Sequence, residues 1–133
     1  MGLDNGILAR SQTIIPALRK YVYEVYPLDE QGNIVYELCY YRKCWNIRYT
    51  ILRGIINYNY REEKYEYPLT IDHIDAIIYM LGHFNEDNWQ EAGGSIWSFD
   101  DMRPCLKRDI KALKKLRKVM KKHEIEVWFY DSY

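Results

Sequence analysis

The sequence predicts a single α+β domain in which a small antiparallel sheet is packed on one side by about three helices. A long basic C-terminal helix and a final strand complete it. Three observations predict this class. Apolar residues alternate over residues 34–42, as in a half-buried strand. They recur at helical spacing in segments that begin near residues 45, 71 and 102. A β-branched and aromatic run then occupies residues 125–130.

The length and composition indicate one folded unit. A chain of 133 residues is long enough to bury one core and too short for two. Its hydrophobic fraction of 48% and charged fraction of 29% are those of ordinary globular proteins. We therefore expect residues 1–133 to form a single domain.

The first third of the chain mixes turn and strand signals. Asp-Asn-Gly at residues 4–6 is typical of a turn, and residues 7–10 follow it as a short strand. Residues 14–26 carry both valines at helical spacing and tyrosines that favour a strand, and we expect a helix. Gly-Asn within residues 29–33 predicts a turn.

The strand at 34–42 has two distinguishable faces. The alternation places Ile34, Tyr36, Leu38 and Tyr40 on one face and Val35, Glu37, Cys39 and Tyr41 on the other. Residues 45–56 then show a helical stripe, weakened by Gly54. Residues 57–66 are polar and rich in tyrosine, which predicts a loop or an edge hairpin.

The second half contains the two longest predicted helices. Thr70 has the side chain of an N-cap and precedes a helix over residues 71–84. Residues 85–100 read as a loop with a short strand at 95–98, which we expect to join the sheet. Asp100 or Asp101 is expected to cap the final helix, with Pro104 in its first turn.

The charge balance and the cysteines argue against several classes of protein. Nineteen basic and nineteen acidic residues do not supply the positive field that a dedicated duplex-DNA binder needs. The three cysteines lack disulfide or zinc spacing, so we expect a reducing cytoplasm and no metal or other cofactor. The sequence begins without a signal-peptide pattern and has no apolar run long enough to span a membrane.

The strongest candidate binding segment is the strand-to-helix junction at residues 40–49, where cations alternate with aromatic rings. Rings stack on bases, and arginine and lysine hold phosphates, so the composition is that of a nucleotide pocket. The expected ligand residues are Tyr41, Arg42, Lys43, Trp45, Arg48 and Tyr49. The alternative is an ordinary strand end whose cations are solvated and whose Trp45 fixes the helix to the sheet.

The final helix is the second candidate. It carries ten basic residues between Arg103 and Lys122 against one acid, Asp109. Such a surface suits an acidic partner, and we expect the contacts to come from Lys111, Lys115 and Lys118. The alternative is neutralisation by residues 62–91, which hold eight acids and one lysine, within the monomer or between subunits.

No catalytic motif is present in the sequence. Cys44 lies near Arg42 and Lys43, which would favour a thiolate, but no histidine partner pattern accompanies it. An enzyme that holds Mg²⁺ through carboxylates of the acidic middle segment is a third hypothesis, without a paired-carboxylate motif to support it.

Four short segments together resemble a known family. They are residues 1–4 (Met-Gly-Leu-Asp), 40–43 (Tyr-Tyr-Arg-Lys), 94–97 (Gly-Ser-Ile-Trp) and 128–133 (Trp-Phe-Tyr-Asp-Ser-Tyr). The chain is similar to small uncharacterised bacteriophage and prophage proteins that begin with Met-Gly-Leu-Asp, carry Tyr-Trp-Arg-Lys and end on an aromatic, serine-containing tail. Tyr41 stands where that family usually has Trp, and Asp-Ser-Tyr replaces a Ser-Ser-Trp-like ending. The resemblance implies a phage or mobile-element origin and the host cytoplasm as the working place, and it supplies no reaction.

These observations favour binding over turnover. Our first hypothesis is a non-enzymatic phage-type protein that counters host defence by capturing a nucleotide-like ligand at residues 40–49. The alternative is an interaction module or inhibitor that docks on a host nuclease or other host protein through its basic final helix. The 14 Tyr and 4 Trp also suit a protein interface. One expected arrangement is therefore a homodimer or higher homo-oligomer in which copies of the chain contact each other through the aromatic sheet face.

Overall fold

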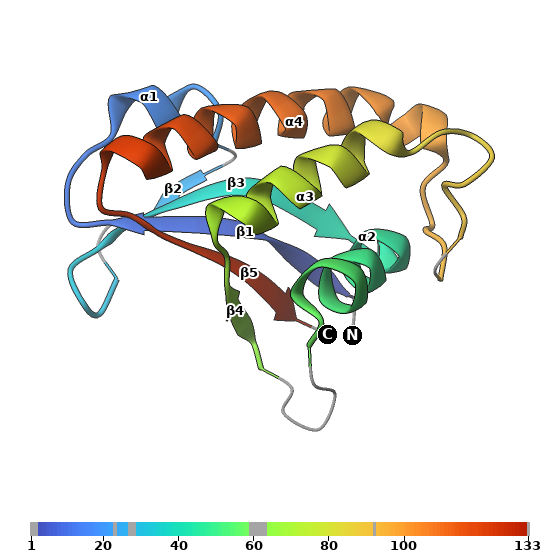
Figure 1. Cartoon of the computed structure of the whole chain (residues 1–133), viewed down its shortest axis with the longest axis horizontal. Coiled ribbons are helices and arrows are strands. Elements are labelled where there is room, and N and C mark those ends of the chain that lie inside the picture. Colours follow the sequence, from blue (N-terminus) through green and yellow to red (C-terminus); the bar gives the residue numbers. More distant parts are fainter. Residues whose placement is uncertain (1–2, 23, 27–28, 59–63, 92, 133) are drawn as a thin grey trace.

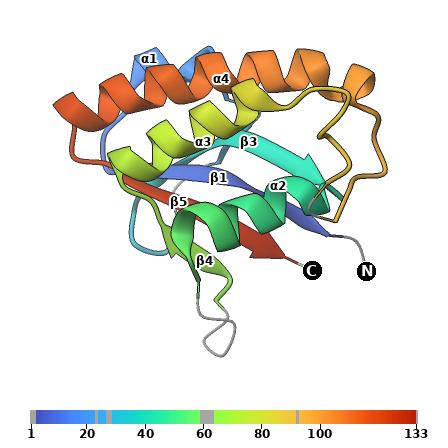
Figure 2. The same ribbon diagram turned by 45° about the vertical axis from the view of Figure 1, so that its right-hand side comes forward.

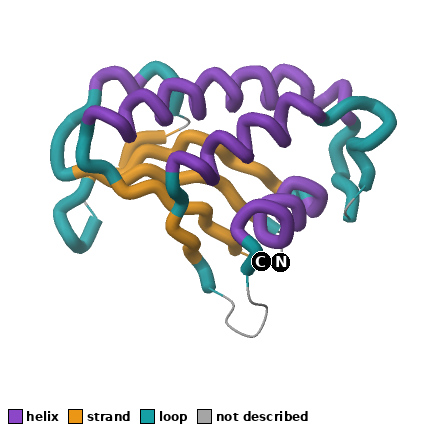
Figure 3. The backbone as a smooth tube through the Cα atoms, viewed as in Figure 1, coloured by secondary structure: helices purple, strands orange, loops and turns teal. Residues whose placement is uncertain are grey.

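The computed structural model describes residues 3–22, 24–26, 29–58, 64–91 and 93–132, and its fold is α+β as expected. A five-stranded antiparallel sheet has the order β2-β3-β1-β5-β4, and the helices lie on one of its faces (Figures 1 and 3). The elements in chain order are β1 Asp4–Ser11, α1 Pro16–Arg19, β2 Glu24–Tyr26, β3 Ile34–Arg42, α2 Trp45–Tyr49, η1 Thr50–Ile56, β4 Glu66–Pro68, α3 Ile71–His83, α4 Phe99–Lys122 and β5 Glu126–Ser132.

The helices form one layer over the sheet. The helices α3 and α4 pack against each other above β1 and β3, and α1 lies beside the C-terminal half of α4 (Figure 1). The helix α2 covers the same face at the end of the sheet where β1 begins and β5 ends, as Figure 2 shows. The opposite face of the sheet therefore carries no helix among the described residues. No described helix is long and apolar enough to cross a membrane.

Three strand predictions are confirmed, including the short strand at residues 7–10, which lies within β1, and one strand prediction and one turn prediction are wrong. The strand β3 has the predicted bounds, and β5 occupies the predicted C-terminal run. The turn predicted at residues 4–6 is instead the start of β1, because this segment pairs with both β3 and β5. Residues 95–98 form part of a loop, and the sheet gains β2 and β4 in place of that strand.

A β-bulge explains why the predicted alternation of β3 fails. Ile7 pairs with Cys39 and Leu8 pairs with Glu37, so Leu38 is an extra residue in β3. Leu38 and Cys39 are both fully buried. Beyond the bulge the two faces exchange, so that Tyr41 is buried and its neighbour Tyr40 is 38% exposed.

Two of the predicted helices differ from the structure in type or extent. The helix expected over residues 45–56 is α2 followed by η1, which has the wider π-helical turn. The segment expected as one helix at residues 14–26 contains the short helix α1 and the strand β2. The predicted loop or hairpin at 57–66 lies partly outside the described residues.

The N-caps of the two long helices differ in one respect from the prediction. Thr70 caps α3 as expected, with a reciprocal hydrogen bond from its own backbone N–H to the His73 ring. The cap of α4 is Ser98, whose hydroxyl accepts a hydrogen bond from the Asp101 N–H at 3.1 Å. Asp101 thus belongs to the capping box without being the cap. Pro104 therefore lies two or three positions further into the helix than predicted.

Candidate functional site

The junction at residues 40–49 is tightly held by its own backbone and by the loop before α4. Lys43 adopts a left-handed conformation (φ 55°), which turns the chain sharply between β3 and α2. The Trp97 indole donates a hydrogen bond to the Arg42 carbonyl at 2.8 Å, and the Asn46 N–H donates to the Gly94 carbonyl at 2.9 Å. The loop thus covers the junction.

Arg48 is a structural residue of this junction. Its Nε lies 2.8 Å from a carboxylate oxygen of Asp131 on β5, and the two side chains are only 7% and 3% exposed. Buried charges of opposite sign are retained when they are paired and hydrogen-bonded, as these are. Arg48 therefore serves the protein interior through its buried ion pair. Its guanidinium also lies 5.4 Å from the centre of the Tyr49 ring.

The other five candidate ligand residues point in different directions. Tyr41 is fully buried below α4, whereas Arg42 is exposed on the opposite face of the sheet. Lys43 and Trp45 are half-buried, and the centre of the Tyr49 ring lies 5.4 Å from the Arg48 guanidinium and 4.6 Å from that of Arg53. Three hollows lined by described residues lie elsewhere, and none of the six candidate residues lines any of these three. The structure does not bring them together around a ligand, and their binding role stays a prediction.

Cys44 sits in surroundings that suppress thiolate chemistry. Its side chain is fully buried, and its thiol donates to the Arg42 carbonyl at 3.5 Å and accepts from the Ser95 hydroxyl at 3.6 Å. Burial raises the pKa of the Cys44 thiol. The adjacent cations that suggested a reactive thiol do not lower that pKa.

The sequence did not predict a buried polar cluster between α4 and β3. Asp109 is fully buried, and burial raises the pKa of its carboxyl. It accepts hydrogen bonds from the Arg108 guanidinium at 2.9 Å and from the Cys105 thiol at 3.5 Å. Arg108 also donates to the carbonyl oxygens of Leu38 and Tyr21. One basic residue of α4 thereby joins this helix to β3 and to the segment after α1.

The lysines of α4 are arranged differently from its arginines. Arg103 pairs with Asp100 at 2.8 Å, and Arg117 pairs with Asp75 on α3. In the part of the chain that the structure describes, the α4 lysines make no such pair. Six of them are exposed, and five of these six recur at intervals of three or four residues, which places the five on one face of the helix. We call this row the lysine stripe: Lys107, Lys111, Lys114, Lys118 and Lys121.

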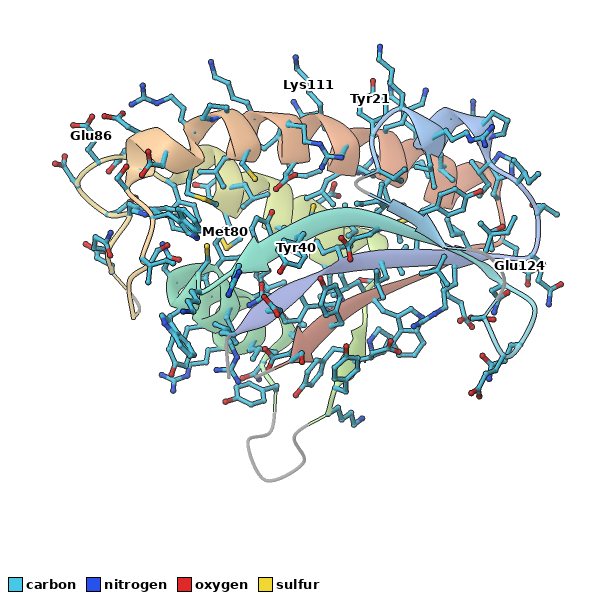
Figure 4. The ribbon with its side chains drawn as sticks, turned by 180° about the vertical axis from the view of Figure 1, so that it is seen from behind. Tyr21, Tyr40, Met80, Glu86, Lys111 and Glu124 are labelled. Atoms are coloured by element: carbon cyan, nitrogen blue, oxygen red, sulfur yellow. The ribbon has the colours of Figure 1, made fainter. Side chains whose placement is uncertain are left out.

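The lysine stripe lies opposite the buried face of α4. The helix buries Leu106, Leu113 and Leu116 against the core, and Lys111 extends from the other side, away from the sheet (Figure 4). Fourteen residues separate the ends of the stripe, so it is about 21 Å long at the helical rise per residue. Of the predicted partner residues, Lys111 and Lys118 belong to it, while Lys115 is half-buried at its side.

No protein-family model, no curated protein and no solved structure matched the chain.

Proposed function

We propose that the chain is a non-enzymatic binding protein that docks on an acidic surface of a partner protein through the lysine stripe of α4. The observation that carries the proposal is the stripe itself: five exposed lysines in a row on a firmly packed helix. A rigid row of like charges attracts a complementary surface over a distance and fixes its orientation on contact.

The stripe is costly for the isolated helix, which supports a role beyond solubility. Like charges three or four residues apart each destabilise a helix by about 0.2–0.5 kcal/mol. The four successive pairs of the stripe together cost about 1–2 kcal/mol by the same measure. The helix macrodipole favours Lys121 near the C-terminus, but it does not favour lysines in the middle of the helix. A bound anionic surface would relieve this repulsion.

A protein partner fits better than a nucleic acid. The formal net charge of the chain is zero, so no overall positive field supports binding to a phosphate backbone. The stripe also contains no aromatic residue for base stacking and no arginine for bidentate phosphate contacts. The resemblance to phage and prophage proteins further favours a host protein, such as a defence component, in the host cytoplasm. Nucleotide capture at residues 40–49 has less support because Tyr41 and Arg48 are buried.

A charge-reversal titration tests the proposal. The probe is a labelled polyglutamate peptide, and its binding is followed by fluorescence anisotropy at low and moderate salt. Lys111→Glu with Lys118→Glu should weaken binding about tenfold or more, because both substitutions replace attraction by repulsion. Lys20→Glu with Lys64→Glu is the matched control, since it changes the net charge equally at two exposed lysines elsewhere.

The control should retain most of the binding seen in the unmodified chain. Equal weakening in both variants would mean that net charge, and not the stripe, determines binding. Tighter binding to a single-stranded RNA of matched length would instead indicate a nucleic-acid partner.

A further inference from the structure

The spacing of the lysine stripe indicates the shape of the partner. Its five lysines follow one another at intervals of four, three, four and three residues. This is a repeat of 3.5 residues, the repeat of a coiled-coil seam. On an α-helix such a seam winds left-handed by about 20° for every seven residues. The stripe is therefore a slightly slanted row of charges over two heptads of α4.

The row has a defined end on either side. The position seven residues before Lys107 in the same repeat is Asp100, whose side chain is 71% exposed. The sign of the charge therefore reverses there. At the other side α4 ends at Lys122, one residue after Lys121. The surface presented to a partner is thus two heptads long.

Two arginines beside the row are bound within the fold. Arg108 donates hydrogen bonds to the carbonyl oxygens of Leu38 and Tyr21. Arg117 pairs with Asp75 on α3. The solvent-facing side of α4 consequently carries ammonium groups on flexible stems, which adjust to carboxylates at a matching spacing.

The distance between successive charges does not match an extended partner. The stripe is about 21 Å long, so neighbouring lysines are about 5 Å apart along the helix axis. Residues on one face of a strand recur about every 6.8 Å, because side chains alternate between the two faces. Five carboxylates on a strand would span about 27 Å, so the last would lie about 6 Å out of register with its lysine.

A second α-helix with the same repeat matches the row. Acidic residues at intervals of three and four have the same axial spacing as the lysines. Two helices whose seams repeat every 3.5 residues pack at a crossing angle of about 20°, which follows the slant of the row. The methylene stems of the lysines can lie along the partner helix while their ammonium groups contact its carboxylates.

We propose that the partner contacts the lysine stripe with an acidic α-helix whose carboxylates recur every three or four residues over two heptads. This inference rests on the proposed docking function and specifies it. Docking requires an acidic protein surface, whereas the inference requires that surface to be a helix. A partner that presents its acids on a loop or strand would satisfy the first and contradict the second.

Fluorescence anisotropy with designed peptides tests the inference. The row peptide is a helix of alanine and glutamine with one glutamate for each lysine of the stripe, at the intervals of the stripe. The shuffled peptide has the same composition and the same helicity by circular dichroism, with its glutamates distributed around the helix. The proline peptide keeps the glutamate spacing, but prolines between the glutamates prevent helix formation. The row peptide should bind about tenfold more tightly than either of the others, because it alone aligns all its carboxylates with the stripe.

Two single substitutions in the chain provide a matched pair. Lys114→Ala, in the middle of the stripe, should weaken binding of the row peptide several-fold. Lys64→Ala removes the same charge at an exposed lysine before β4 and should leave this binding unchanged.

The outcomes separate the inference from the docking function. If the proline peptide or the shuffled peptide binds as tightly as the row peptide, and Lys111→Glu with Lys118→Glu weakens all of them, the helical partner is overturned and acidic docking stands. If no peptide binds, or if none responds to charge reversal in the stripe, the docking function itself fails and the inference fails with it.

Discussion

Two basic regions of this molecule, the junction at residues 40–49 and the helix α4, use their cations in opposite ways. Arg48 of the junction is 6% exposed and paired with Asp131, 83 residues further along the chain. The lysine stripe of α4 is exposed along its whole length. Composition alone does not separate these cases, because the difference comes from what the other strands and helices place beside each cation. The junction cation stabilises the fold, and the stripe cations remain available to a partner.

Arg48→Ala should have the largest effect on stability. It leaves the Asp131 carboxylate buried without its charged partner, a loss that typically costs about 3–5 kcal/mol. Urea denaturation followed by circular dichroism would measure the free energy of unfolding. The double variant Arg48→Met with Asp131→Leu should recover most of the loss, because both buried charges are then gone. A loss below about 1 kcal/mol for Arg48→Ala would show that the pair is effectively a surface salt bridge.

Arg108→Ala tests whether the arginines of α4 contribute more to the stability of the fold than its lysines do. It removes hydrogen bonds to the Leu38 and Tyr21 carbonyls and to the buried Asp109 carboxylate. We expect a loss of about 1.5–3 kcal/mol, the usual range for hydrogen bonds of a charged group. Lys107→Ala, one residue earlier and exposed, is the control and should change stability by less than about 0.5 kcal/mol. Equal effects would contradict the distinction.

Asp109→Asn should have a smaller effect that depends on pH. Burial raises the folded-state pKa of Asp109 above its ordinary value of 3.8, so the favourable contribution of this group is present below that value. It is lost as pH rises through the raised folded-state pKa. The variant cannot ionise here, and its stability relative to the unmodified chain should therefore rise with pH over this window. Denaturation curves at several pH values would measure the difference.

Asp29 provides a control of opposite sign. Hydrogen bonds from the Asn33 backbone lower its pKa, so its contribution is present above the ordinary carboxyl pKa and is lost as pH falls. The relative stability of Asp29→Asn should therefore fall as pH rises. The same sign in both variants would mean that general charge effects dominate.

Lys111→Glu with Lys118→Glu should cause no loss of stability. Both side chains are exposed and lack a described ion pair, and the two substitutions replace the four like-charge pairs of the stripe by opposite-charge pairs, so the free energy of unfolding should rise by about 1–2 kcal/mol. The thermal midpoint should therefore not fall while peptide binding is lost. A strong destabilisation would show that the stripe supports the fold.

The sequence predicted the α+β class, the strand at 34–42 and the cap at Thr70 because each depends on local patterns. It did not predict the bulge at Leu38, which depends on the register with β1 and turns Tyr41 into the core. The burial of Arg48 depends on its hydrogen bond to Asp131, and no local sequence pattern contains this long-range contact. The exposed stripe was partly predicted, since Lys111 and Lys118 follow helical spacing, whereas Lys115 falls beside it.

Lysine footprinting during peptide binding compares the two regions in one measurement. The chain is acetylated with and without the polyglutamate peptide, and mass spectrometry gives the modification rate of each lysine. The account predicts strong protection of Lys111, Lys114 and Lys118 and unchanged modification of Lys43 in the junction. Protection of Lys43 without protection of the stripe would contradict it.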